Sequence, residues 1–230
     1  MKILLVAVNA CYNHTNLAVR SIYHYVNKNE IVDFAEWTIN QNVQEILRGI
    51  AEYKPDVVMF SAYIWNAEII QKLICDVKKI LPNCVVGAGG PEVSFYAEGY
   101  LKKLTALDFV VCGEGEETVC EIVQIYEKLF SDCDCEFEGK LLLENIKNCK
   151  GVYTKRGDEI TFLGNRELIQ DLADLPFAYP QITDPDNRIY YYESSRGCPF
   201  SCSYCMSSLD KRVRFMPLER VYEDSKYIPK

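Results

Sequence analysis

Two short apolar stretches decide the fold: DVVMFSA (residues 56–62) and CVVGAGG (residues 84–90). Each begins with an almost continuous apolar run, which is typical of a strand that is covered on both faces. KILLVAV (residues 2–8) and DFVVC (residues 108–112) share this character, and EIVDFAEW (residues 30–37) is a more polar fifth run. We therefore expect five strands in the first half of the chain.

Apolar residues recur at helical spacing between these runs, in residues 43–50, 69–77 and 119–126. Strands that alternate with helices predict an α/β fold with a doubly wound, five-stranded parallel sheet of the flavodoxin-like or Rossmann-like kind. We assign this domain to residues 1–130. The first strand is not followed by Gly-x-Gly-x-x-Gly, which argues against an ordinary dinucleotide fold. The absence of Gly-Lys-Ser/Thr excludes a phosphate-binding P-loop.

Composition narrows the class of protein. The net charge of −8 and the pI near 5.0 argue against a nucleic-acid partner, because phosphate binding needs a basic surface. The longest early apolar run, residues 3–8, is too short for a signal peptide or a membrane span, so we expect a cytoplasmic protein with no membrane contact. Eleven cysteines, an odd number, do not suit a secreted disulfide scaffold.

The middle of the chain, residues 131–187, is predicted to be a linker. Its first part is acidic and weakly periodic, and we expect Cys133 and Cys135 to lie in an exposed turn. GVYTKRGDEITFLG (residues 151–164) predicts a hairpin, because Arg-Gly-Asp lies between two alternating runs. IYYYESS (residues 189–195) is predicted to be a strand that leads into the last segment.

Ligands of an open parallel sheet bind beyond the carboxyl ends of its strands. Four loops are expected there: NACYNHTN (residues 9–16), SAYIWN (61–66), GAGGPEVS (87–94) and GEGEE (113–117). The glycines suit close approach by a ligand, but they suit ordinary tight turns equally well. Glutamates at a helix N-terminus are explained by the helix dipole. A lone loop histidine such as His14 is more often a hydrogen-bonding group than a metal ligand.

Three cysteines follow in RGCPFSCSYC (residues 196–205), where Cys198, Cys202 and Cys205 have the spacing C-x3-C-x2-C. Thiolates select zinc or iron–sulfur clusters. Structural zinc uses four ligands, usually in two pairs, and no second pair follows. A redox pair would need only C-x2-C. Three thiolates on one tight loop suit a four-iron cluster in which one iron stays open for chemistry.

GCPFSCSYC resembles the cluster motif of the radical S-adenosylmethionine (SAM) superfamily. The resemblance implies that Cys198, Cys202 and Cys205 bind three irons of a [4Fe–4S] cluster. The fourth iron would chelate the amino and carboxylate groups of S-adenosylmethionine, and Tyr204 would pack near its adenine. One-electron reduction, from a donor such as flavodoxin or ferredoxin, would give a 5′-deoxyadenosyl radical that abstracts hydrogen from a small-molecule substrate.

The whole arrangement, an α/β domain followed by a hairpin and the cysteine motif, is similar to radical SAM enzymes that carry an N-terminal cobalamin-binding domain. Anaerobic magnesium-protoporphyrin ester cyclases and many methyltransferases belong to this group. Its members have Ser-x-Leu after the third strand, where this chain has Ser61 and Tyr63, and Gly-Gly after the fourth, here Gly89 and Gly90. The serine would then bond the nucleotide tail of the corrinoid, and the glycines would admit that tail.

One departure concerns the first loop. The Asp-x-His-x-x-Gly motif that supplies an axial histidine to cobalt in many such domains is absent, and the loop that begins at Asn9 and contains His14 stands in its place. Either cobalamin binds without a histidine below cobalt, or the domain has lost the cofactor. We keep Asn9 and His14 as candidate cofactor-binding residues.

Residues 188–230 are expected to begin a β/α barrel, and the chain is expected to be an N-terminal fragment. A barrel of six or more units would need on the order of 150 further residues. The leading hypothesis is the amino-terminal part of a cobalamin-type radical SAM enzyme, inactive alone, for methyl transfer or oxidative cyclisation. The alternatives are a non-enzymatic corrinoid or small-molecule carrier with a vestigial cysteine loop, and a zinc-stabilised interaction protein.

Overall fold

The computed structural model describes residues 2–26, 31–130, 137–180 and 187–228, so Cys133 and Cys135 lie outside the described residues. Seven strands form one sheet in the order β2-β1-β3-β4-β5-β6-β7. They are β1 (Ile3–Asn9), β2 (Val32–Thr38), β3 (Val57–Ser61), β4 (Val85–Gly89), β5 (Phe109–Val111), β6 (Val152–Arg156) and β7 (Glu159–Phe162). The helices around it are α1 (Leu17–Val26), α2 (Val43–Tyr53), α3 (Ala67–Ile80), α4 (Pro91–Ser94), α5 (Ala97–Lys103), α6 (Gly115–Phe130) and α7 (Gly139–Ile146).

Strands β1 to β5 are parallel, which confirms the predicted five-stranded sheet. Every residue of β1 is buried, and alternate side chains enter opposite layers of the core. Leu4, Val6 and Val8 join one core cluster, whereas Ile3 and Leu5 join the other. The continuous apolar run of the sequence is therefore explained by a strand with no solvent face.

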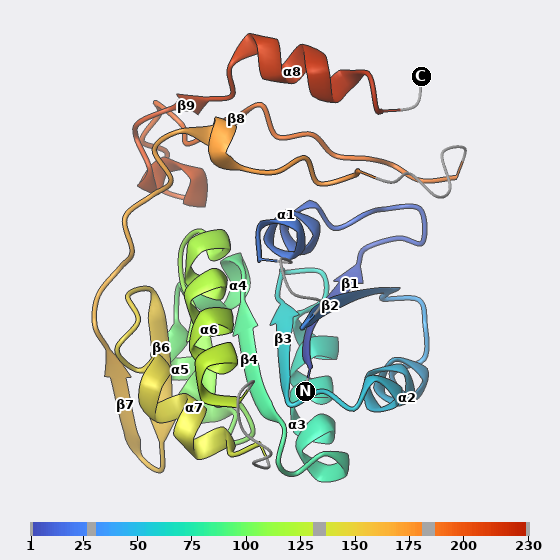
Figure 1. Cartoon of the computed structure of the whole chain (residues 1–230), viewed down its shortest axis with the longest axis vertical. Helices are drawn as coiled ribbons and strands as arrows, with labels where there is room; N and C mark the ends of the chain where they lie inside the picture. The colour runs from blue at the N-terminus through green and yellow to red at the C-terminus, as the bar shows by residue number, and fades with distance from the viewer. Residues whose placement is uncertain (1, 27–30, 131–136, 181–186, 229–230) are drawn as a thin grey trace.

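Helices cover both faces of the sheet (Figure 1), as expected for a doubly wound fold. The apolar sides of α2, α3 and α5 pack in one layer, and those of α1, α6 and α7 pack in the other. The three helices predicted from periodicity are confirmed as α2, α3 and α6. No helix in the described ranges combines the length and the apolar character that crossing a membrane would require.

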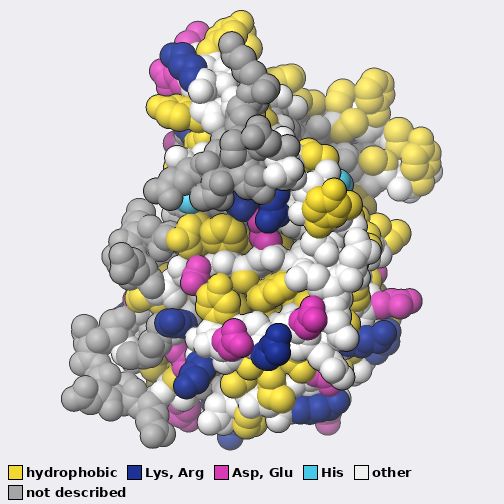
Figure 2. Space-filling view, turned by 90° about the vertical axis from the view of Figure 1, so that its right-hand side faces the viewer, with side chains coloured by type: hydrophobic (Ala, Val, Ile, Leu, Met, Phe, Trp, Pro, Cys, Tyr) yellow, Lys and Arg dark blue, Asp and Glu magenta, His cyan; other side chains and the backbone are white. Residues whose placement is uncertain are grey.

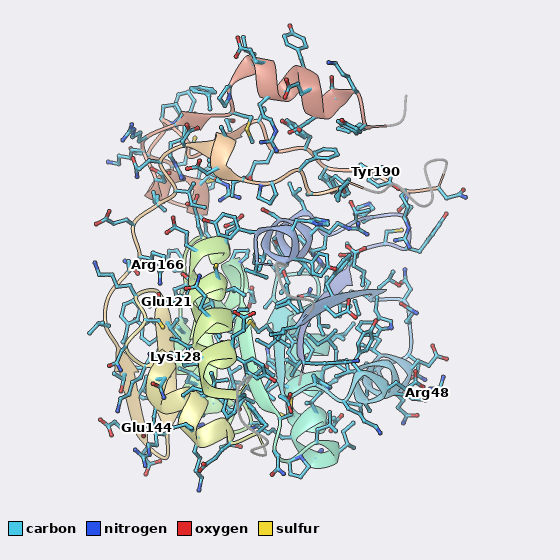
Figure 3. The ribbon with its side chains drawn as sticks, in the orientation of Figure 1. Arg48, Glu121, Lys128, Glu144, Arg166 and Tyr190 are labelled. Atoms are coloured by element: carbon cyan, nitrogen blue, oxygen red, sulfur yellow. The ribbon has the colours of Figure 1, made fainter. Side chains whose placement is uncertain are left out.

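The predicted hairpin is present as β6 and β7, but it belongs to the sheet. β6 pairs antiparallel with β5, so the hairpin extends the sheet from five strands to seven. It thereby covers an edge of β5 that would otherwise expose unpaired backbone groups. The chain then leaves this edge beside α6, where Arg166 and Glu121 form an ion pair; Figure 3 labels both residues.

The last segment, residues 187–228, lies across the end of the sheet at which the β3 arrow points (Figure 1). It contains the two-stranded ladder of β8 (Ser195–Arg196) and β9 (Arg214–Phe215), followed by α8 (Leu218–Ser225). The strand predicted over residues 189–195 is largely wrong: an isolated bridge at Ile189 and the two-residue β8 are what form. Within the described residues this stretch meets ladder partners at its two ends alone, and an extended run needs a neighbour to become a strand.

Candidate functional site

The carboxyl ends of β3 and β4 bring two predicted site residues together. Ser61 and Gly89 are direct register partners in the parallel ladder. One residue further on, the Ala62 amide donates to the Gly89 carbonyl at 2.8 Å. The loops that carry Ser61 and Gly89-Gly90 thus lie side by side at the carboxyl ends of β3 and β4.

Gly90 has an intramolecular reason to be glycine. Its φ is +98°, a region that other residues rarely adopt, and a Cβ atom would lie 2.6 Å from the Ala62 carbonyl oxygen. The missing side chain lets the two loops pack against each other, whether or not a ligand approaches. Ser94 then closes the turn, because its hydroxyl donates to the Gly90 carbonyl at 2.8 Å.

Asn66, which the sequence did not single out, ties the ends of β1 and β3. Its side chain is 1% exposed. The amide nitrogen donates to the carbonyl oxygens of Val8 (2.9 Å) and Ser61 (3.0 Å), and the amide oxygen accepts from the Tyr63 backbone at 2.8 Å. A buried Asn with several bonds fixes the path of the loop that carries Tyr63.

The first loop is organised by Asn9, which is buried. Its side-chain nitrogen donates to the His14 carbonyl at 2.9 Å, and its oxygen accepts from the side chain of Asn16 at 3.3 Å. Asn16 in turn begins α1, since its oxygen accepts from the Val19 amide. Asn9 thus shapes the loop from inside, and it remains a predicted cofactor residue.

His14 faces the last segment of the chain. It forms a parallel bridge with Ile189, and its Nδ1 lies 3.1 Å from the Tyr191 hydroxyl. The neighbouring Thr15 hydroxyl donates to the Ile189 carbonyl at 2.8 Å and lies 3.0 Å from the buried hydroxyl of Tyr179. The first loop therefore forms the surface against which residues 187–191 pack.

Large apolar side chains are exposed on three neighbouring loops of this edge. Tyr12 follows β1, Ile64 and Trp65 follow β3, and Phe95 and Tyr96 follow α4; their exposed fractions run from 46% for Trp65 to 82% for Ile64. Large exposed apolar side chains on neighbouring loops are a feature of binding sites. Figure 2 also shows hydrophobic side chains protruding at the upper right, at the end of the molecule where the last segment lies, above a lower part dotted with charges.

The loop after β3 presents its aromatic residues as a stack. The rings of Tyr63 and Trp65 lie 4.4 Å apart and are nearly parallel, at 9°. Burial raises the pKa of Tyr63, so its hydroxyl stays protonated at neutral pH. Tyr63 and Trp65 thus form a flat aromatic stack on the loop that neighbours the Gly90 turn.

The cysteine loop is built on a tight turn at Gly197. Its φ is +91°, and a Cβ there would overlap the carbonyl oxygen of Arg212. The Cys198 amide donates to the Asp210 carbonyl at 2.9 Å, which closes the base of the loop. Cys205 and Tyr204 are exposed, the latter to 90%.

The three cysteines form no disulfide. In the parts of the chain that the structure describes, no group of three or more His, Cys, Asp and Glu side chains is arranged to hold a metal ion. The three thiols of this loop are soft donors of the kind that zinc and iron–sulfur clusters select.

Four charged side chains connect the cysteine loop to the sheet, of which Glu116 and Arg214 are buried and Glu114 and Arg196 are partly buried. Arg196 contacts Glu116 at 2.6 Å and Glu114 at 3.2 Å, and Arg214 contacts Glu114 at 2.8 Å. Both glutamates lie at the N-terminus of α6, in the loop that follows β5. The helix dipole was the predicted reason for these acids; the arginines are a second reason that the sequence did not reveal.

The protonation states of this group follow from its contacts. Burial alone would lower the pKa of Arg196, but bonds and attraction from Glu116 and Glu193 raise it above its usual value. Burial would raise the pKa of Glu114, yet the Arg214 guanidinium and the Ile169 amide hold it below its usual value. The Arg214 guanidinium, whose pKa is also raised by its bond to Glu114, and the Glu114 carboxylate thus each favour the charged form of the other.

Comparisons with known proteins show the family to which this chain belongs. The model of the B12 binding domain family matches residues 3–123. An uncharacterized methyltransferase of Pyrococcus horikoshii, PH0819, is 30% identical over 78% of this chain and 38% of its own length. The cobalamin-dependent radical SAM methyltransferase TokK of Streptomyces tokunonensis is 30% identical over 71% of this chain and 23% of its own. An anaerobic magnesium-protoporphyrin IX monomethyl ester cyclase of Cereibacter sphaeroides is 25% identical over 80% of this chain and 28% of its own length.

The chain thus spans well under half the length of these relatives. A solved structure of the cobalamin-dependent S-adenosylmethionine radical enzyme OxsB, with aqua-cobalamin and S-adenosylmethionine bound, has a TM-score of 0.72 over 98% of this chain and 31% of its own. At 15% identity this likeness concerns the fold. The predicted resemblance to cobalamin-binding radical SAM proteins is confirmed, and the chain belongs to the B12-binding domain family.

Proposed function

We propose that this chain is the amino-terminal part of a cobalamin-dependent radical SAM enzyme that carries out methyl transfer or oxidative cyclisation. The carrying observation is the exposed aromatic edge of a B12-binding sheet with the C-x3-C-x2-C loop docked above it by buried ion pairs. The printed activities of TokK and of the ester cyclase support the two reaction types.

Cobalamin would lie at the edge formed by β1, β3 and β4. Ser61 would form a hydrogen bond with its nucleotide tail, and Gly89 and Gly90, which lack side chains, would leave room for that tail beside the backbone. Asn9 and His14 would border the site from the first loop. The stacked pair of Tyr63 and Trp65 would exclude water from the corrin face. No histidine stands where an axial ligand is usual, so the aromatic surface would contact that face.

Cys198, Cys202 and Cys205 would hold a [4Fe–4S] cluster, with Tyr204 beside the adenine of S-adenosylmethionine. Such a cluster supplies the electron that cleaves S-adenosylmethionine, and a corrinoid supplies a cobalt centre that carries a methyl group. A flavodoxin or ferredoxin would be the electron donor, a small molecule the substrate, and the cytoplasm the compartment. The exposure of Tyr204 and Cys205 is consistent with cofactor binding on that side.

Two titrations test this function. Hydroxocobalamin added to the chain should give a saturable spectral change, weakened at least tenfold by Trp65→Ala. Anaerobic reconstitution of the whole protein with iron and sulfide should give about four irons per chain, lost on Cys198→Ala and retained on Cys75→Ala, a matched thiol on α3. Absence of both cofactors would overturn the proposal.

The carrier alternative makes a different prediction. A corrinoid or small-molecule carrier with a vestigial cysteine loop would bind hydroxocobalamin and take up no cluster in the whole protein. A zinc-stabilised interaction protein would instead hold one zinc per chain after purification without added iron. The exposed aromatic edge favours a corrinoid-binding enzyme or carrier over a zinc-stabilised interaction protein, because a zinc site does not account for exposed aromatic side chains.

A further inference from the structure

The ladder of β8 and β9, which we call the stem of the cysteine loop, contains a pair of like charges. β8 and β9 form a ladder of two residue pairs, in which Arg196 lies directly opposite Arg214. Like charges opposite each other destabilise an antiparallel pair, and two residue pairs supply little to offset this. Within the same segment Glu193 contacts Arg196 at 2.8 Å and Asp210 contacts Arg214 at 2.9 Å, but these side chains are more exposed (38% and 23%) than Glu114 (16%) and Glu116 (5%). The stem therefore gains its better shielded counter-charges, and with them further help, from outside itself.

That help comes from α6. Glu114 Oε1 lies 3.2 Å from Arg196 and 2.8 Å from Arg214, so one carboxylate serves both arginines. Glu116 forms a second ion pair with Arg196 at 2.6 Å. It also accepts a hydrogen bond from the Ser21 hydroxyl of α1 at 2.9 Å. Glu116 is 3% exposed and Arg214 is 6% exposed, so water screens these charges weakly.

The stem also sets the loop. Arg196 lies two residues before Cys198, and Asp210, whose carbonyl accepts from the Cys198 amide, contacts Arg214 at 2.9 Å. Both ends of the loop thus depend on the arginine pair. Glu114 further accepts from the Ile169 amide at 2.8 Å, so the chain that leads to the loop is fixed by the same carboxylate.

We propose that Glu114 and Glu116 are positioning residues that close the stem of the cysteine loop by neutralising the Arg196–Arg214 pair. The loop is then ordered only while it is docked on the helix that follows β5. This makes the order of the cysteine loop depend on the B12-binding domain. The consequence for a metal centre rests on the proposed function; the closure of the stem does not.

Hydrogen–deuterium exchange of the chain tests the closure without any cofactor. Glu114→Gln should speed exchange of the peptide over residues 195–205 at least tenfold, while peptides of β1, β3 and β4 keep their protection. Lys78→Gln is the matched control, because Lys78 and Asp108 form an ion pair of similar burial (24% and 18% exposed) at the opposite end of the sheet. It should leave the loop unchanged.

A double variant separates charge neutralisation from general packing. Arg214→Gln alone also removes the contacts of Arg214 with Asp210 and Ile169, so it serves as the reference background. If Glu114 acts by neutralising the arginine pair, Glu114→Gln should speed exchange much less in the Arg214→Gln background than in the wild type. If Glu114→Gln speeds exchange equally in both backgrounds, Glu114 acts independently of the Arg214 charge and the proposal is overturned. Equal loss of protection in the loop and in the sheet would overturn it as well.

Reconstitution with iron and sulfide links the closure of the stem to the proposed function. In the whole protein, Glu114→Gln should bind hydroxocobalamin normally but retain less than half of the wild-type iron. Should wild-type protein take up neither iron nor hydroxocobalamin, the proposed function fails, while the exchange result still decides the closure of the stem. Wild-type iron content in Glu114→Gln would refute the dependence of the loop on α6.

Discussion

The side-chain amide of Asn66 donates to the carbonyl oxygen of Val8 at 2.9 Å and thereby joins residues 58 positions apart in the chain. This bond lies where β1 and β3 end, beside the loop that carries Tyr63. Asn66 completes its bonding with the Ser61 carbonyl and the Tyr63 amide, so this buried side chain meets three backbone partners.

Asn66→Ala should therefore lower the free energy of unfolding by about 2–4 kcal/mol, because it leaves buried carbonyl and amide groups without partners. Urea unfolding measures this. Asn42→Ala, at the exposed N-cap of α2, should cost about 1 kcal/mol. Hydroxocobalamin affinity should fall in the first variant and stay unchanged in the second. Equal costs for the two variants would contradict the role assigned to Asn66.

Gly90→Ala should destabilise the chain by about 2–4 kcal/mol, since it combines a strained positive φ with a clash against the Ala62 carbonyl. Gly157→Ala is the matched control. It also has a positive φ, at +59°, but a Cβ there meets nothing within 4 Å, so strain alone should cost about 1 kcal/mol. Thermal or urea unfolding compares them. A smaller effect at Gly90 than at Gly157 would refute the close packing of the two loops.

The strands were predictable because burial on both faces leaves a direct mark in the sequence. Residues 57–60 are apolar and buried throughout because β3 lies between helices on both faces of the sheet. The pairing of β6 with β5 was not predictable. A hairpin pattern fixes the pairing of its own two strands, whereas its attachment to a sheet edge depends on where the chain returns in space.

The site was predictable in part for a related reason. The cysteine spacing and the Gly-Gly pair are local patterns, so the sequence carries them directly. The contact of Arg196 with Glu116 spans 80 residues, and that of Arg214 with Glu114 spans 100, so no spacing rule links them. Glu114 and Glu116 also had a sufficient local explanation in the helix dipole, which concealed their second role.

Thiol reactivity should divide the cysteines into two classes. Burial raises the pKa of Cys84 and Cys149 to about 12 and that of Cys112 to about 11, and the thiolate is the reactive form. In native protein at pH 8.5, iodoacetamide should modify the exposed Cys205 at least a hundredfold faster than Cys84. Mass spectrometry of the alkylated peptides measures both rates.

Unfolding in urea is the control for this comparison. Once burial is lost, Cys84 and Cys205 should react at similar rates. Reconstitution with iron and sulfide should protect Cys198, Cys202 and Cys205 and leave the buried thiols as slow as before. Rapid labelling of Cys84 in native protein would show that its surroundings open far more often than a fully packed core allows.

Alkaline pH should destabilise the fold through Tyr126. This side chain is fully buried, and its hydroxyl donates to Asp56 at 2.7 Å. Burial, reinforced by Asp56, raises the pKa of Tyr126 above its usual value, so the folded state holds the proton more tightly than the unfolded state does. Its contribution is complete below about pH 10 and is lost as the pH rises toward the folded-state pKa.

Tyr126→Phe removes this titration together with the hydrogen bond. At pH 7 the variant should be less stable by about 1 kcal/mol. Above pH 10 its free energy of unfolding should fall less steeply than that of the wild type, by up to about 1.4 kcal/mol per pH unit. Parallel slopes for wild type and Tyr126→Phe would mean that Tyr126 ionises as readily in the folded chain as in the unfolded one, which its burial against Asp56 forbids.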